Sequence, residues 1–244
     1  MKRNEDVLFS LVIPLHNEEE NIPFLIKELE EVLPSIGPFE VIAVDDGSTD
    51  KTFDLLIKEK KEGNRPWLRI IKLKRCYGQS GALSAGFDLA RGRYLCMMDG
   101  DMQNDPRDLK KMIEILMRGE ADVVSGVRQK RMDSFSRKIS SKIANSIRDF
   151  ITGEKVIDSA CGIKAFKREA WKDIPRLNSM HRFMPTLFRM RGLKVLHIPV
   201  NHRPRKAGKA KYGIRNRAIR GLIDSFGIRW LKSRYVSPEV EKED

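Results

Sequence analysis

Residues 93–103, RYLCMMDGDMQ, contain the pattern that decides the fold: a short apolar run followed at once by carboxylates. The run from Tyr94 to Met98 is bounded by Gly92 and Gly100, which is typical of a buried β-strand. Open α/β sheets bind their ligands at the carboxyl ends of their strands. The polar residues after this run are therefore candidates for a ligand site.

Two of these polar residues have the spacing of a metal site. Asp99 and Asp101 are two residues apart on chain that leaves an extended strand, so their oxygens can converge on one hard cation. Gln103 adds a neutral third ligand, and this leaves room for water and substrate phosphates, which is how Mg²⁺ or Mn²⁺ is usually bound. The alternative is an acidic turn that caps a helix beginning near Pro106, because a D-x-D pair alone is a weak motif.

Apolar runs of strand length alternate with segments of helical period, which predicts an α/β fold with a mostly parallel sheet and helices on both faces. The expected strands are 9–15, 39–44, 68–73, 94–98, 121–125 and 195–200, with a loop and strand over 158–166. The expected helices are 19–33, one through 55–57, 80–90, 109–116, 137–151, 183–190 and 216–231. The helices 137–151 and 216–231 are amphipathic, with lysine and arginine beside an apolar face.

Charge is distributed unevenly along the chain. The formal net charge is +13, and residues 126–234 hold 28 lysines and arginines against 7 aspartates and glutamates. Such asymmetry indicates a polyanionic partner for the C-terminal half: nucleic acid, an anionic membrane surface or a phosphorylated substrate. The length predicts one domain over 1–236, followed by a charged tail at 237–244.

The cysteines and the hydropathy pattern predict the compartment. Cys76, Cys96 and Cys161 lack metal-ligand spacing, and an odd, scattered count favours a reducing environment. The N-terminal segment does not resemble a signal peptide, and no apolar stretch approaches the roughly 18 residues of a membrane span. We therefore expect a cytoplasmic protein with no transmembrane segment.

Carboxylates follow three of the expected strands, and in a parallel sheet the ends of those strands share one edge. The residues are Glu18, Asp45 with Asp46, and Asp99 with Asp101. The G-x-G-x-x-G turn of dinucleotide-binding proteins is missing after the first strand, and the G-x-x-x-x-G-K-[ST] loop is missing throughout. The negative charge of a bound phosphate must therefore be neutralised by a metal ion and by basic side chains.

Several motifs, taken together, resemble the family 2 inverting glycosyltransferases of the glycosyltransferase-A fold, a Rossmann-like nucleotide-binding sheet. They are IPLHNEE (13–19), VDDGSTD (44–50), the segment 78–86, DGDMQ (99–103), GVR (126–128), CGIKAF (161–166) and HRPRKAGKAKYG (202–213). The last three narrow the resemblance to the polyprenyl-phosphate glycosyltransferases, which include dolichol-phosphate mannose synthase. The likeness extends from about residue 9 to residue 232.

The resemblance implies a nucleotide-sugar-binding half at about 1–125 and a basic acceptor-binding half at about 126–236. The nucleotide-sugar residues would be Pro14, His16, Glu18, Ala43, Asp45, Asp99, Gly100, Arg205 and Lys211. A carboxylate such as Asp45 can accept the imino N–H that uracil and guanine share, so the donor would be a UDP- or GDP-linked sugar. The metal ligands would be Asp99, Asp101 and Gln103, and Mg²⁺ or Mn²⁺ would stabilise the departing diphosphate.

The acceptor in this family is a lipid phosphate, which is already anionic and needs positioning cations rather than a general base. The resemblance assigns Arg128, Arg137 and Ser141 to that phosphate, and it makes Asp101 and Arg128 the catalytic residues. The two amphipathic helices would contact an anionic membrane from its inner face. The alternative is that they pack as ordinary core helices; a homodimer or a partner membrane subunit is a further possibility.

Three functions compete. The leading one is metal-dependent inverting transfer of a hexose, from GDP-mannose or a UDP-hexose, to dolichyl or undecaprenyl phosphate at the cytoplasmic membrane face. A carbohydrate hydroxyl acceptor in surface polysaccharide synthesis would need a general base. Residues 180–183 have His and Arg where other branches carry an acidic pair, although Asp158 is a candidate base. Nucleic-acid binding explains the charge but not the carboxylate turns, so no nucleic acid is expected.

Overall fold

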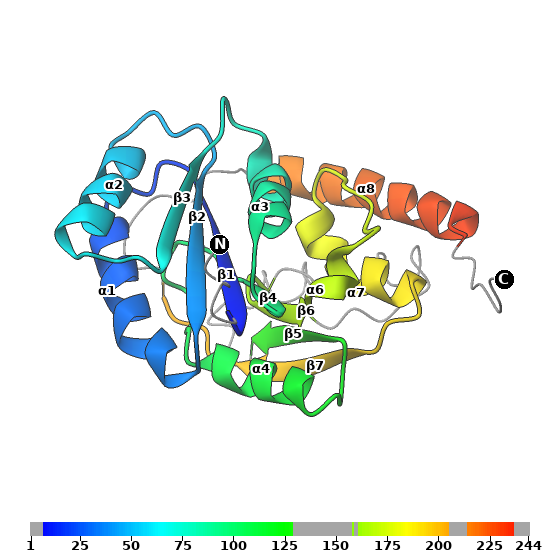
Figure 1. Cartoon of the computed structure of the whole chain (residues 1–244). Coiled ribbons are helices and arrows are strands. Elements are labelled where there is room, and N and C mark those ends of the chain that lie inside the picture. Colours follow the sequence, from blue (N-terminus) through cyan, green and yellow to red (C-terminus); the bar gives the residue numbers. More distant parts are fainter. Residues whose placement is uncertain (1–6, 129–157, 159–160, 205–213, 237–244) are drawn as a thin grey trace, which may run out of the picture.

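The structure is a computed structural model that describes residues 7–128, 158, 161–204 and 214–236 (Figure 1). The strands are β1 (Phe9–Leu15), β2 (Phe39–Asp45), β3 (Leu68–Lys72), β4 (Tyr94–Met97), β5 (Val123–Arg128), β6 (Lys164–Lys167) and β7 (Val195–Val200). The helices are α1 (Ile22–Val32), the short 3-10 helix η1 (Leu33–Ser35), α2 (Thr52–Glu62), α3 (Gly78–Leu89), α4 (Asp108–Met117), α6 (Arg168–Trp171), α7 (Met180–Met190) and α8 (Ile214–Arg234).

The described strands form one sheet of seven in the order β3-β2-β1-β4-β6-β5-β7. Only β6 runs antiparallel to its neighbours, β4 and β5, which confirms the predicted mostly parallel sheet. The first strand lies between β2 and β4, so strand order reverses there. Ligands bind at such a reversal in open α/β sheets.

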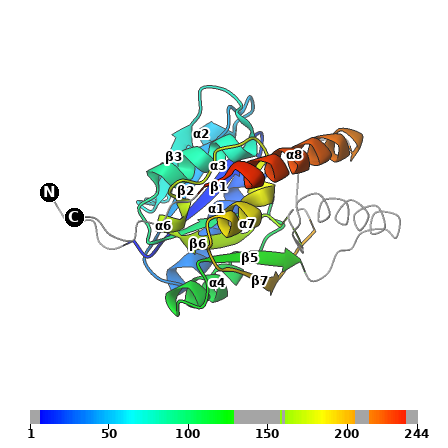
Figure 2. The ribbon, with the colours of Figure 1, turned by 90° about the vertical axis from the view of Figure 1, so that its right-hand side faces the viewer.

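Each face of the sheet has its own apolar core, because alternate strand residues point to opposite faces. Leu11 and Ile13 of β1 pack with residues of α1, α2 and α4, whereas Val12 packs with residues of α3, α6, α7 and α8. The predicted helical cover on both faces is therefore confirmed, and the two layers are visible in Figures 1 and 2. The predicted helix 137–151 lies outside the described residues.

The C-terminal helix α8 is buried on one side and exposed on the other. Ile228 is 3% exposed and belongs to the second core. Ile223, Phe226 and Trp230, at helical spacing, are 64%, 60% and 65% exposed. The helix therefore packs on the protein with one face and presents an apolar stripe with the other. No helix in the described part of the chain is both long enough and apolar enough to cross a membrane.

Candidate functional site

The turns after β1 and β2 are joined by hydrogen bonds. The Asn17 N–H donates to the Ser48 hydroxyl at 2.9 Å, and the Thr49 N–H donates to the Asn17 side-chain oxygen at 2.7 Å. His16 Nδ1 lies 2.8 Å from the carbonyl oxygen of Asp46. The Glu18 N–H donates to Thr52 Oγ1 at 2.8 Å and the Glu19 N–H to Asp50 Oδ2 at 3.2 Å. These bonds hold the residues just before α1 against the second turn, and α1 begins at Ile22, three residues after the predicted position at Glu19.

Asp45 and Asp46, at the end of β2, have different surroundings. Asp45 is fully buried; its Oδ1 accepts the Ser48 N–H at 3.2 Å, whereas its Oδ2 has no hydrogen-bond partner among the described residues. An unsatisfied buried acceptor costs about 1–3 kcal/mol, which a bound N–H donor would offset. Asp46 instead accepts the Tyr77 N–H at 2.7 Å and holds the start of α3.

Some of the other predicted nucleotide-sugar residues lie beyond the ends of the strands, and some lie within the strands. His16, Glu18 and Gly100 lie beyond the ends of β1 and β4, whereas Pro14 lies within β1 and Ala43 is a buried core residue within β2. A Cβ at position 100 would lie 2.3 Å from a Leu15 methyl carbon, so glycine lets this turn pass close to β1. Arg205 and Lys211 lie outside the described residues.

The turn after β4 (residues 98–105), here called the metal turn, brings the predicted metal ligands together. Burial, and then the charge of Asp101, raise the pKa of Asp99 to about 6. Gln79 donates to Asp99 Oδ1 at 2.7 Å, and Asp101 Oδ1 accepts the Gln103 N–H at 3.2 Å. Asp101 is 8% exposed. Two carboxylates that repel each other in a buried turn are suited to a cation.

These residues fit Mg²⁺ or Mn²⁺ as a partial ligand set. The amide nitrogen of Gln103 donates to the carbonyl of Arg203 at 3.4 Å, so its amide oxygen is the atom for coordination. Within the described ranges no three His, Cys, Asp or Glu residues converge as a metal site. A cation here would therefore take its other ligands from water and a diphosphate, as Mg²⁺ commonly does.

Gly162 and Lys164, which were not among the predicted site residues, lie beside Asp99. A Cβ at position 162 would lie 2.1 Å from Asp99 Oδ2. Lys164 is 1% exposed, its ammonium donates to the Cys161 carbonyl, and burial lowers its pKa. The antiparallel pairing of β4 with β6 creates this proximity. The only sequence signal was the CGIKAF motif containing them, and it does not reveal the contact.

Gly162→Ala should weaken Mn²⁺ binding about tenfold, because the added methyl group must displace the Asp99 carboxylate or the backbone. Titration followed by electron paramagnetic resonance of free Mn²⁺ measures this. Gly221→Ala is the matched control, since a Cβ at that position meets no atom within 4 Å. An unchanged Mn²⁺ affinity in Gly162→Ala would show that Asp99 is not held against this glycine.

Arg128, predicted to bind the acceptor phosphate, ends β5 and forms a two-point ion pair with Asp158. Its Nε donates to Asp158 Oδ2 at 2.8 Å and its Nη2 to Oδ1 at 2.8 Å. The side chain of Asp158 is 5% exposed. The candidate base of the hydroxyl-acceptor alternative is therefore bound to the arginine of the phosphate-acceptor prediction. Arg137 and Ser141 lie outside the described residues.

His181, near the start of α7, packs against α3. Its Nδ1 lies 2.9 Å from the hydroxyl of Ser80, and both residues are largely enclosed. Burial lowers the pKa of His181 to about 3, with Arg182 as the second cause. The imidazole is therefore neutral at physiological pH. Residues 180–183 contribute no acidic pair to this region.

Comparison with known proteins supports the resemblance. Residues 10–174 match the model of Glycosyl transferase family 2. The chain belongs to this family. It is 38% identical over 225 residues to a dodecaprenyl-phosphate galacturonate synthase of Rhizobium johnstonii, covering 90% of this chain and 65% of that protein. It is 35% identical over 204 residues to an undecaprenyl-phosphate 4-deoxy-4-formamido-L-arabinose transferase of Salmonella paratyphi B, covering 83% and 62%. The chain thus spans just under two thirds of the length of these relatives.

Solved structures confirm the glycosyltransferase-A fold of this family 2 glycosyltransferase. A mannosyltransferase from Pyrobaculum calidifontis, in complex with GDP-Man and Mn²⁺, matches with a TM-score of 0.68 at 18% identity, covering 96% of this chain and 67% of the other. A glucosyl-3-phosphoglycerate synthase from Mycobacterium tuberculosis, with Mn²⁺ and UDP, matches with a TM-score of 0.67 at 20% identity, covering 91% and 80%. At 18–20% identity these two matches show a shared fold and nothing more specific.

Proposed function

We propose that this family 2 glycosyltransferase transfers a sugar, with inversion, from a nucleoside diphosphate to a polyprenyl phosphate at the cytoplasmic face of a membrane. The observation that carries the proposal is the position of Asp99, in the turn after β4, and of Arg128, at the end of β5, because only β6 separates these two strands. A site for a leaving diphosphate thus lies beside a cation that can hold a second phosphate. Both curated relatives described above are named as polyprenyl-phosphate sugar synthases or transferases.

The donor is proposed to bind at the edge formed by β1, β2 and β4, with its base at Asp45. The unpartnered Oδ2 of Asp45 is the acceptor that an imino N–H of uracil or guanine would satisfy. Asp99, Asp101 and Gln103 would hold Mg²⁺ or Mn²⁺, which would supply positive charge to the departing diphosphate. Both a UDP-linked and a GDP-linked sugar suit this donor set.

The acceptor is proposed to be a phosphate because the described site offers positioned cations rather than a free base. Asp158 orients the Arg128 guanidinium through two hydrogen bonds, so the arginine is held ready for an anionic oxygen. A carboxylate paired in this way is a poor proton acceptor for a sugar hydroxyl. The hydroxyl-acceptor alternative is therefore the less favoured of the two.

The exposed stripe of α8 is proposed to contact the membrane that holds the lipid. Arg229 and Lys232 are exposed near Phe226 and Trp230, and interfacial helices combine such apolar and basic residues.

Phe226→Ser with Trp230→Ser should reduce binding to anionic vesicles about tenfold or more in a sedimentation assay. Met117→Ser on α4, which also removes an exposed apolar side chain, should bind vesicles normally. Equal vesicle binding by both variants would contradict a lipid-facing α8. If the unmodified protein dimerised with rising concentration and the α8 variant did not, the exposed stripe would instead be a homodimer interface.

The direct test incubates the purified protein with Mn²⁺, polyprenyl phosphate and a panel of UDP- and GDP-sugars, and detects glycolipid by mass spectrometry. Product with one donor and β-to-α or α-to-β inversion at the anomeric carbon is expected. Free oligosaccharide acceptors serve as the comparison. Transfer to those acceptors, with none to the lipid phosphate, would replace this proposal with the hydroxyl-acceptor alternative.

A further inference from the structure

The metal turn is hydrogen-bonded to the segment that follows β7. The backbone N–H of Arg203 donates to the carbonyl of Gln103 at 2.8 Å, and the Gln103 amide nitrogen donates back to the carbonyl of Arg203 at 3.4 Å. Asn104 and His202 form an isolated antiparallel bridge beside them. A predicted metal ligand is thus hydrogen-bonded directly to residue 203.

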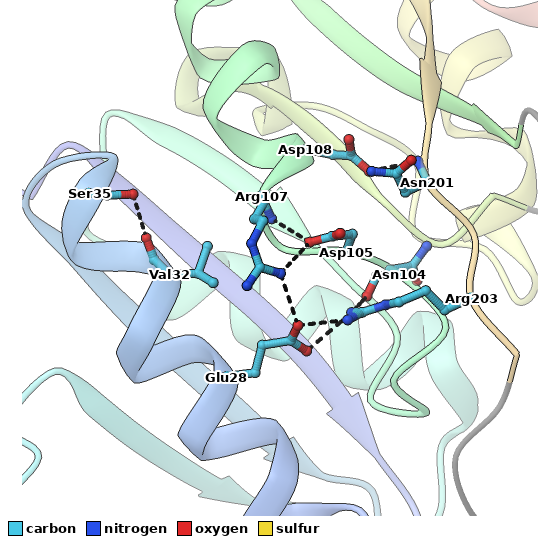
Figure 3. Close-up of polar contacts among 9 residues, drawn as sticks. All are labelled: Glu28, Val32, Ser35, Asn104, Asp105, Arg107, Asp108, Asn201 and Arg203. Atoms are coloured by element: carbon cyan, nitrogen blue, oxygen red, sulfur yellow. Dashed lines mark hydrogen bonds and ion pairs between the residues drawn. The ribbon is translucent and has the colours of Figure 1, made fainter.

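The side chain of Arg203 ties this junction to α1 (Figure 3). Its Nη1 donates to Glu28 Oε1 at 2.7 Å and its Nη2 to Oε2 at 3.1 Å, while Nη2 also donates to the carbonyl of Asn104. The side chains are 33% and 14% exposed. The hydrogen bond and charge of Glu28 raise the pKa of Arg203. One guanidinium therefore joins α1, the metal turn and the segment after β7.

The metal turn needs such an external support because its backbone is unfavourable by itself. Met102, between Asp101 and Gln103, has φ +64, in the left-handed region that L residues rarely adopt, and it is 6% exposed. A residue keeps this unfavourable backbone conformation only where contacts with the surrounding structure hold it there. Arg107 also reaches Glu28 at 3.4 Å, but its side chain is 60% exposed and adds little.

We propose that Glu28 and Arg203 form a clamp that positions the metal turn, and through it Gln103, for a divalent cation and the donor diphosphate. Both are positioning residues, because neither touches the reacting atoms in this arrangement. The inference rests on the proposed metal site. It adds two residues from different parts of the sequence: Glu28 lies in none of the quoted motifs, and Arg203 lies in HRPRKAGKAKYG (202–213) but was not among the predicted site residues.

The test compares Glu28→Gln with Glu30→Gln. Both glutamates lie on α1 and make a two-point ion pair with an arginine; Glu30 pairs with Arg65, at 2.8 and 3.1 Å, away from the metal turn. Glu28→Gln should raise the Kd for Mn²⁺ about tenfold, whereas Glu30→Gln should leave it unchanged. Free Mn²⁺ is measured by electron paramagnetic resonance, and thermal melting checks that both variants are folded.

Arg203→Lys provides a second variant of the clamp. Lysine keeps the charge but cannot make the two-point contact, so Mn²⁺ affinity should fall as in Glu28→Gln. The double variant should be little weaker than either single one, because the two residues act as a unit. Wild-type Mn²⁺ affinity in Glu28→Gln, or an equal loss in Glu30→Gln, would overturn the clamp. If the wild-type protein and Asp101→Asn bind Mn²⁺ equally, the proposed metal site itself fails.

Discussion

Asp101→Asn is expected to fold normally and to lose about a thousandfold in kcat for sugar transfer, which corresponds to ~4 kcal/mol of transition-state stabilisation. Asn keeps the volume and one acceptor oxygen, so the hydrogen bond from the Gln103 N–H can persist. It removes the negative charge that, with Asp99, would hold the cation at the leaving diphosphate. The readouts are glycolipid formation, Mn²⁺ binding and thermal melting.

Asp105→Asn is the control for that experiment. Asp105 lies in the same turn, and its Oδ1 accepts the Arg107 N–H at 3.0 Å, which Asn can still do. Near-normal turnover is expected, because Asp105 is not a proposed ligand. If Asp101→Asn retained normal turnover while Asp105→Asn lost it, the metal assignment within this turn would be wrong.

Arg128→Ala should affect both acceptor binding and stability. Loss of the guanidinium should raise the KM for polyprenyl phosphate about thirtyfold or more, since truncating a buried charge partner costs about 2–5 kcal/mol. It also leaves the Asp158 carboxylate, at 5% exposure, without its two-point partner. A broken buried pair costs about 3–5 kcal/mol of folding free energy, so the melting temperature should fall. The KM for the nucleotide sugar should change little.

A double variant separates these two effects. Arg128→Gln with Asp158→Asn removes both charges together, so most of the lost stability should return. The high acceptor KM should remain, because the cation for the phosphate is still absent. A double variant that recovered a normal acceptor KM would mean that Arg128 is purely structural and that the acceptor phosphate binds elsewhere.

The sequence by itself predicted the order of the described strands and the position of the carboxylates, but it missed the short helix α6 and placed the fifth strand at 121–125 instead of 123–128. β1 and β7 have the predicted bounds, and β2 and β4 differ by one residue from the predictions 39–44 and 94–98. This agreement has a physical cause: buried strands must be apolar, and the polar turn after each strand ends it. Residues adjacent along the chain, such as Asp99 and Asp101, could therefore be assigned to one turn without a structure.

The tertiary structure alone decided which distant residues meet at that turn and which face of α8 is buried. Gly162 approaches Asp99 because β6 pairs antiparallel with β4, and Arg203 reaches Glu28 because β7 ends beside the metal turn. Both contacts join residues that are far apart in the sequence, and no sequence periodicity predicts such contacts. The sequence predicted that the helix 216–231 is amphipathic, and only the packing showed that Ile228 is buried whereas Ile223, Phe226 and Trp230 are exposed. Helical periodicity groups residues on a face, but contacts with other elements determine whether that face meets the core or solvent.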